Sequence, residues 1–203
     1  VQTCALPIWL VSNGCDLGIF DDESILPKRP KQLEKVGFLA LFCGAHGIAN
    51  GLHAVLDAAE ELKQRGRKDI SIAFVGQGKM KPELMKRAED GRLDNLHFLD
   101  SMPKFALVGL MKSADVGLMI LANVPAFYRG TSPNKFFDYI AAGLPVLNNY
   151  PGWLSDLISE NDSGFVIEPD NPIAFADGIE RAADDRTALE AKGKNARALA
   201  GRS

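Results

Sequence analysis

The sequence predicts an α/β fold of the Rossmann-like type, in which a parallel sheet is covered by helices on both faces. Short apolar runs alternate with longer segments whose apolar residues recur every three or four positions, over about six units. The apolar runs are continuous, which is typical of strands buried on both faces. Glycines often follow the runs directly, at the turns that open on the carboxyl edge of such a sheet.

The first unit shows this pattern most completely. A continuous apolar run from Phe38 to Cys43 ends at Gly44 and predicts the first buried strand. Leu52, Val55, Leu56, Ala59 and Leu62 then share one helical face, and Gly66 marks the expected end of that helix.

The same alternation continues to the end of the chain. Further strands are expected at 70–75, 96–99, 116–121, 146–147 and 164–167. Further helices are expected from Pro82, near 105–112, at 133–142, near 153–159, at 172–183 and at 188–200.

Composition limits the class of function. A formal net charge of -3 gives no basic balance of the kind that nucleic-acid binding needs. The cysteines Cys4, Cys15 and Cys43 form no CxxC pair, which fits a reducing compartment, and the three histidines show no zinc-type spacing. No apolar run is long enough to span a bilayer. We therefore expect a cytoplasmic protein, and leave open a peripheral position at the inner face of the cytoplasmic membrane.

The chain ends are set apart from the fold. Residues 1–8 (VQTCALPI) read as one frame of a common sequencing adaptor, with a native strand at Pro7 to Val11 as the alternative. Residues 9–37 are expected to be an interdomain segment and linker, in which the charged, proline-containing stretch from Asp21 to Lys35 lies on the surface. Residues 38–203 are expected to form the main domain.

Two glycine-rich turns follow the first two strands. The first is GAHGIANG at 44–51, and the second is Gly76-Gln77-Gly78. Glycines let a backbone approach a ligand closely, and the following helix N-terminus favours phosphate. Neither spacing is a known phosphate motif, so each turn can equally serve packing alone. For His46 we favour a solvent-facing side chain, with a phosphate contact as the alternative.

The segment GTSPNKFFDYIAAGLPV at 130–146 is the most informative. Thr131 or Ser132 can cap a helix that begins at Pro133 and leave amides free for an anion. Lys135 lies in the first turn, where a cation opposes the helix dipole, so a bound diphosphate would explain it. Asp138, about one turn later, is placed to accept hydrogen bonds from ribose hydroxyls.

These segments together resemble glycosyltransferase family 4, retaining enzymes with the two-domain GT-B fold. SPNKFFDYIAAGLPVL resembles the donor-site signature of the branch that builds bacterial capsule and lipopolysaccharide O-antigen, including N-acetyl-fucosaminyl-type transferases. Further segments resemble parts of the family's sequence in the same order: SNGCDLGIF, GAHGIANGL, FVGQG and SADVGLMIL. The resemblance covers about residues 12–185. It implies that the chain is the C-terminal half of a GT-B enzyme and that an N-terminal acceptor domain is missing.

The resemblance implies a set of residues that bind a nucleotide-diphosphate sugar, with UDP as the expected nucleotide. They are Gly44, Gly47, Asn50, Gly76, Gly78, Thr131, Ser132, Pro133, Asn134, Lys135 and Asp138. No cofactor and no metal are expected, and no residue is assigned as catalytic. The acceptor, a saccharide or lipid-linked saccharide, would bind through the missing domain, so the fragment alone is expected to be inactive.

Some positions depart from the family pattern. Gly130 stands where the first Glu of the Glu-x7-Glu motif falls, and Ala45 and Asn50 stand where many members carry Arg and Lys. These departures keep two alternatives open. One is a non-catalytic nucleotide-binding module, and the other is a different GT-B enzyme such as a sugar-nucleotide 2-epimerase.

Overall fold

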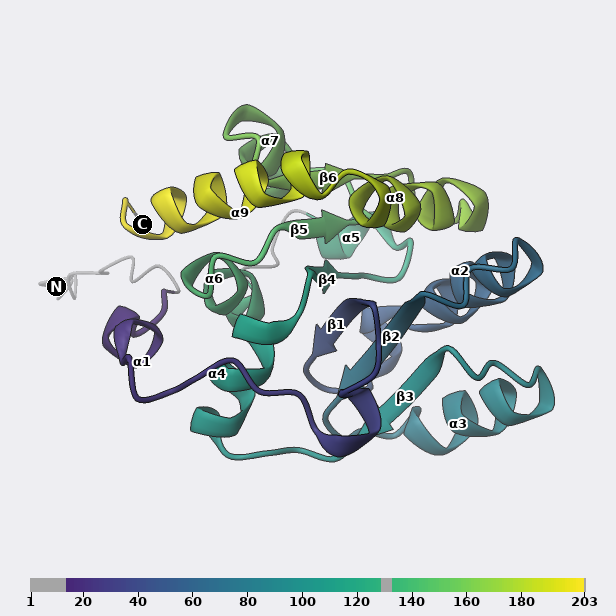
Figure 1. Cartoon of the computed structure of the whole chain (residues 1–203). Coiled ribbons are helices and arrows are strands. Elements are labelled where there is room, and N and C mark those ends of the chain that lie inside the picture. The colour runs from purple at the N-terminus through teal and green to yellow at the C-terminus, as the bar shows by residue number, and fades with distance from the viewer. Residues whose placement is uncertain (1–13, 129–132, 203) are drawn as a thin grey trace, which may run out of the picture.

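Parallel strands form one sheet in the computed structural model, which describes residues 14–128 and 133–202 (Figure 1). Within those residues the sheet has six strands in the order β3-β2-β1-β4-β5-β6, and every neighbouring pair is parallel. The strands are β1 (Phe38–Cys43), β2 (Ile70–Val75), β3 (Leu96–Leu99), β4 (Val116–Met119), β5 (Val146–Asn148) and β6 (Gly164–Val166). The predicted Rossmann-like sheet is confirmed.

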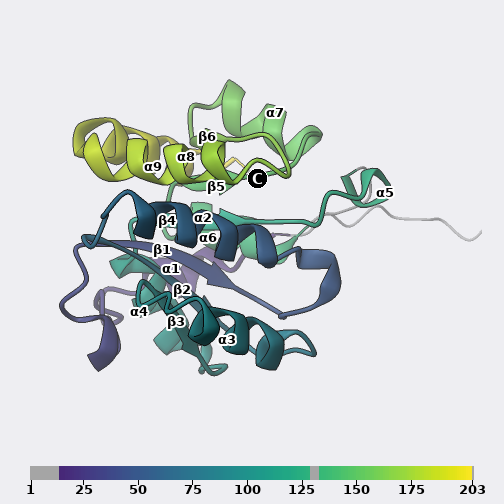
Figure 2. The same ribbon diagram turned by 90° about the vertical axis from the view of Figure 1, so that its right-hand side faces the viewer.

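Helices connect the strands and follow the predicted positions closely. The longer ones are α2 (His53–Gln64), α3 (Lys81–Asp90), α4 (Lys104–Ser113), α6 (Asn134–Ala141), α7 (Trp153–Glu160), α8 (Pro172–Asp184) and α9 (Arg186–Ala200). The sequence patterns missed the short elements α1 (Leu17–Asp21), η1 (Lys31–Leu33), η2 (Ile48–Asn50) and α5 (Pro125–Tyr128). Segments this short contain too few residues for a periodic pattern. In Figure 2, α5 stands out from the rest of the molecule.

The side chains of β1 divide between two cores by strict alternation. Phe38, Ala40 and Phe42 belong to a core with α2, α3 and α8. Leu39, Leu41 and Cys43 belong to a second core with α4, α6 and α9. In Figure 1, α4 and α6 accordingly lie on one side of the central strands, and α2 and α3 lie on the other. The continuous apolar run of β1 thus reflects helices on both faces of the sheet.

The stretch from Asp21 to Lys35 is mostly exposed, as its composition predicts, but single residues anchor it to the domain. Leu33 is completely buried, and the Arg29 guanidinium donates two hydrogen bonds to the Ser113 carbonyl, at 3.0 and 2.8 Å. Arg29 also pairs with Asp115 at 3.0 Å. Composition predicts only the average exposure of a segment. It does not reveal that single residues such as Leu33 and Arg29 attach the segment to the domain.

Candidate functional site

The carboxyl edge of the sheet opens between β1 and β4, where the strand order changes direction. These two strands are paired only at Ala40 with Val116 and at Leu41 with Gly117. Beside those pairs, the hydroxyl of Tyr139 in α6 forms hydrogen bonds with main-chain groups of β1. It accepts from the Cys43 amide at 2.8 Å and donates to the Leu41 carbonyl at 3.1 Å. Ligands of open α/β sheets bind in the crevice at such a switch point.

A cavity of about 490 Å³ lies at this edge of the sheet, beyond the ends of β1 and β2, and it brings together four of the predicted donor-site residues, Gly44, Gly76, Lys135 and Asp138. One wall comes from the turns after β1 and β2, a second from the segment at 101–111, and a third from α6. Met102, Leu107 and Met111 make the second wall largely apolar. A cavity with an apolar wall and a few charged groups is the usual form of a small-molecule site.

The two glycine-rich turns pack directly against each other. Beyond the end of β1, the His46 amide donates to the Gln77 carbonyl at 2.9 Å, which extends the pairing of β1 and β2. A side chain at Gly76 would collide with the Gly44 carbonyl oxygen, and a Cβ at Gly78 would lie 2.5 Å from the His46 carbonyl oxygen. Contact between the two turns therefore requires glycine at positions 76 and 78, whether or not a ligand binds there. A Cβ at Gly47 would meet nothing closer than the Asn50 amide nitrogen at 4.0 Å.

The Lys135 ammonium lies at the cavity beside the first glycine-rich turn. Its nitrogen donates to Asn50 Oδ1 at 3.1 Å and sits 4.1 Å from the centroid of the Phe42 ring. Neither partner carries a formal charge. Burial lowers the pKa of Lys135 to about 8. An ammonium held this way is available to a bound anion.

Asn50 joins this ammonium to the turn. Its side-chain nitrogen donates to the Ala45 carbonyl at 2.7 Å, and its side-chain oxygen accepts from Lys135. Asn50 does not line the cavity itself. The turn at 44–51 contains no Lys or Arg, and the ammonium beside it comes from α6.

The Asp138 carboxylate lies at the cavity and is paired with a cation that the sequence patterns did not single out. Lys104 Nζ, at the start of α4, donates to Asp138 Oδ1 at 2.6 Å. The two residues lie 34 positions apart in the sequence. Nothing in their local patterns predicts the contact, because it depends on how α4 and α6 pack.

The helix within the segment at 130–146, α6, begins one residue later than predicted. Pro133 is the N-cap residue, with an extended ψ of 124°, and α6 begins at Asn134. Pro133 makes no side-chain cap bond, and the predicted start of the helix at Pro133 is corrected by one residue. Thr131 and Ser132 themselves, like Gly130, lie outside the described residues. Neither Pro133 nor Asn134 lines the cavity.

His46 is buried, and the expectation of a solvent-facing side chain is wrong. Its exposed fraction is 0%, and both ring nitrogens are buried without a hydrogen-bond partner. The ring packs among Phe42, Phe74 and Phe98, with centroid distances of 5.9 to 6.5 Å. Burial, followed by the charges of Lys81 and Lys135, lowers the pKa of His46. It contacts protein rather than a ligand, because the pairing of the two turns directs it into the core.

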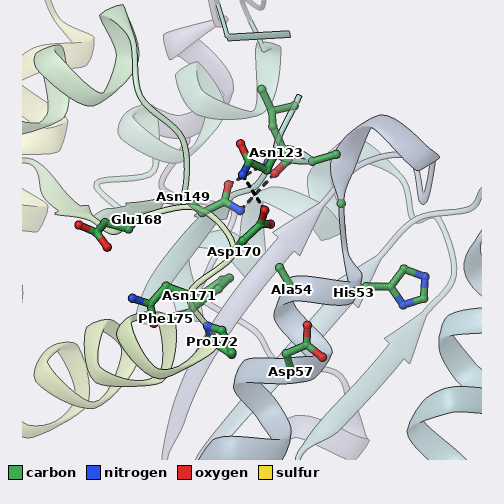
Figure 3. A pocket seen from close by; sticks show the side chains of 13 residues that line it. His53, Ala54, Asp57, Asn123, Asn149, Glu168, Asp170, Asn171, Pro172 and Phe175 are labelled. Atoms are coloured by element: carbon green, nitrogen blue, oxygen red, sulfur yellow. Dashed lines mark hydrogen bonds between the residues drawn. The ribbon is translucent and has the colours of Figure 1, made fainter. Parts of the chain in front are cut away.

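A second hollow of about 290 Å³ lies at the same edge of the sheet, between the N-terminal ends of α2 and α8 (Figure 3). Asn123 Nδ2 donates to Asp170 Oδ2 at 2.6 Å, and Asn149 is bound to the main chain of Leu121. None of the predicted donor-site residues lines it, and its carboxylates, Asp57, Glu168 and Asp170, would repel a diphosphate. The cavity beside Lys135, which holds an ammonium, is therefore the better candidate for binding an anion.

Among residues 14–128 and 133–202, no group of three or more His, Cys, Asp or Glu side chains is arranged to hold a metal ion. None of the helices there combines the length and apolar character needed to cross a membrane.

Residues 26–199 match the sequence family described as glycosyl transferases group 1. Among curated proteins, the chain is 24% identical over 188 residues to an alpha-D-kanosaminyltransferase of Streptomyces kanamyceticus, covering 89% of this chain and 46% of that protein. It is 27% identical over 162 residues to the D-rhamnosyltransferase WbpZ of Pseudomonas aeruginosa, covering 78% and 39%. The chain thus spans less than half the length of these relatives.

Solved structures share the fold. HepE of Anabaena in complex with UDP-glucose superposes with a TM-score of 0.76 at 19% identity, covering 93% of this chain and 51% of that one. The C-terminal domain of a glycosyl transferase group 1 family protein (LpcC) from Francisella tularensis superposes with a TM-score of 0.68 at 17% identity, covering 94% and 98%. The Rossmann-like architecture is therefore that of GT-B glycosyltransferases.

Proposed function

Since the chain belongs to the family of glycosyl transferases group 1, we propose that it is the donor-binding part of an enzyme that transfers sugar from a nucleotide-diphosphate sugar. One observation carries the proposal. The cavity at the carboxyl edge of the sheet holds the Lys135 ammonium, whose contacts, Asn50 and Phe42, are formally uncharged. A diphosphate is the natural anion for such a place.

The cavity suggests how the donor lies. The diphosphate would occupy the space beside Gly44 and Lys135, and the ribose hydroxyls would donate to Asp138. The base would lie against the apolar wall formed by Met102 and neighbouring side chains. The HepE structure in complex with UDP-glucose supports UDP as the nucleotide, because its fold is the same.

We assign the enzyme more finely on the sequence resemblance. It would be a retaining enzyme of family 4, in the branch that builds bacterial surface polysaccharides, and it would need no metal. The acceptor, a saccharide or lipid-linked saccharide, would bind a part of the protein outside this chain. The expected location is the cytoplasm, and the alternative is a peripheral position at the inner face of the cytoplasmic membrane.

This chain would contribute to the reaction mainly by electrostatic stabilisation. When the bond between sugar and diphosphate breaks, negative charge grows on the leaving diphosphate. The Lys135 ammonium lies at the cavity where that charge would develop, so it would stabilise the transition state. We assign no general acid or base to this chain, and expect it to bind nucleotide without transferring sugar by itself.

Calorimetric titration with UDP, GDP, ADP and NAD tests the proposal. UDP should bind in preference to the others, and Lys135→Ala and Asp138→Ala should each weaken UDP binding by about tenfold, as loss of a charge-assisted hydrogen bond does. Lys86→Ala, at an exposed position of α3 away from the cavity, is the matched control and should bind like the unchanged chain. A normal UDP affinity in both cavity variants would contradict the proposed site.

A non-catalytic nucleotide-binding module is the second candidate. Gly130 in place of the first Glu of the motif favours it, as do Ala45 and Asn50 on the first turn. The full-length protein separates the two functions. A transferase would release UDP from a UDP-sugar when given acceptor, whereas a binding module would hold the nucleotide without turnover. A 2-epimerase would convert the sugar nucleotide without any acceptor.

A further inference from the structure

Lys104 stands at a place that is unfavourable for its charge. It is the first residue of α4, after the N-cap residue Pro103, and the first turn holds no acidic residue and no side-chain cap bond. The positive end of the helix dipole lies at this terminus, so a cation there destabilises the helix. Local helix energetics therefore do not explain a lysine at this position.

Two contacts hold the Lys104 side chain. Its ammonium donates to Asp138 Oδ1 at 2.6 Å and lies 5.4 Å from the centroid of the Phe20 ring in α1. The Asp138 side chain is only 18% exposed, whereas that of Lys104 is 45% exposed. Without this partner, Asp138 would be a mostly buried carboxylate with no ion pair, which is costly.

The ion pair connects two walls of the cavity. Asp138 belongs to the α6 wall, and Lys104 lies two residues after Met102, which belongs to the opposite wall. The pair uses Oδ1 of the carboxylate, and a carboxylate has a second oxygen that can accept further hydrogen bonds. Lys104 itself does not line the cavity.

We propose that Lys104 is a positioning residue for the ribose of the bound nucleotide. It fixes the Asp138 carboxylate in one orientation, so that its second oxygen accepts from the ribose hydroxyls. This inference rests on the proposed function, which places the ribose at Asp138. It adds a residue, outside the signature segment, that acts on the nucleotide through Asp138.

Titrations with UDP and with 2′,3′-dideoxy-UDP, which lacks both ribose hydroxyls, test the inference. Lys104→Met keeps the length of the side chain and removes its charge. It should weaken UDP binding by about tenfold and leave dideoxy-UDP binding within about twofold, because only UDP uses the oriented carboxylate. Lys104→Arg restores the ion pair and should recover most of the UDP affinity. In an Asp138→Asn background, Lys104→Met should cause little further loss.

Lys112→Met serves as the matched control, because Lys112 lies on the same helix and binds main-chain carbonyls away from Asp138. It should affect UDP and dideoxy-UDP equally. Equal losses for the two ligands in Lys104→Met, or no loss for UDP, would overturn the inference while the proposed function stands. If the unchanged chain binds no nucleotide, the proposed function fails and the inference fails with it.

Discussion

Among single residues, Lys135 combines a charge with a partly buried position beside uncharged partners. Burial lowers its pKa to about 8, while the contact with the Phe42 ring and the Asn50 oxygen keeps the ammonium in place. Near neutral pH the side chain is therefore mostly protonated, but it loses its proton within the next two pH units. Anion binding at this position should follow that titration.

UDP affinity should fall by about tenfold between pH 7 and pH 9, because deprotonation removes the charge that attracts the diphosphate. The terminal phosphate of UDP is already ionised above pH 7, since its second pKa is about 6. Lys135→Arg keeps its charge throughout this range and should make the affinity nearly independent of pH. Calorimetry at pH 7, 8 and 9 checks this, and an equal slope in both proteins would contradict the role of Lys135.

The sequence predicted which segments lie together at the candidate site better than it predicted the contacts of single side chains. Gly44, Gly76, Lys135 and Asp138 do meet at one cavity, because turns after neighbouring parallel strands open at one edge. The pairing of Asp138 with Lys104 and the burial of His46 were missed. Both depend on how separate elements pack, and a local pattern carries no information about that.

Among the secondary-structure elements, α6 is coupled most directly to the site. It carries Lys135 and Asp138, and its Tyr139 is completely buried with the hydroxyl bound to the main chain of β1. Gly117 of β4 leaves room for this ring, since a Cβ there would lie 2.7 Å from it. The position of α6 is therefore fixed against the two strands that form the crevice.

Tyr139→Phe should lower the free energy of unfolding by about 1 to 3 kcal/mol, because the buried Cys43 amide loses its acceptor. Tyr150→Phe is the matched control. Tyr150 is also buried, but its hydroxyl has no hydrogen-bond partner. Removing that hydroxyl should change stability by less than about 0.5 kcal/mol or increase it slightly. Urea denaturation measures both, and equal effects would show that the β1 contacts of Tyr139 add nothing.

Element positions could be predicted from the sequence more reliably than element ends. The strand expected at 116–121 is assigned as Val116–Met119, although Ile120 and Leu121 remain buried. Burial continues past the point where β4 stops pairing, so an apolar run overestimates the strand. At α6 the extended ψ of Pro133 delays the helix by one residue. The end of a strand is set by pairing geometry, to which hydrophobicity is only a guide.

On the scale of the whole molecule, the buried His46 and the partly buried His97 link folding stability to pH. His46 lies with both ring nitrogens unpaired, and His97 Nε2 is also buried without a partner. Burial lowers the pKa of each below its ordinary value of 6.5. The unfolded chain therefore binds protons below about pH 6.5 that the folded chain does not bind, so stability falls as the pH drops through this range.

His46→Leu should reduce this loss of stability between pH 6.5 and 5, because leucine binds no proton. At pH 7.5 the variant should be more stable by about 1 kcal/mol, since it removes buried nitrogens that lack partners. The Asp22, Asp69 and Asp100 carboxyls, whose pKa values are lowered in the folded chain, act only at lower pH, below about 4. Urea denaturation at intervals from pH 7.5 to 5 measures the effect, and His97→Leu should remove a further share of the slope. An unchanged slope in both variants would mean that the histidines are not what makes the fold acid-sensitive.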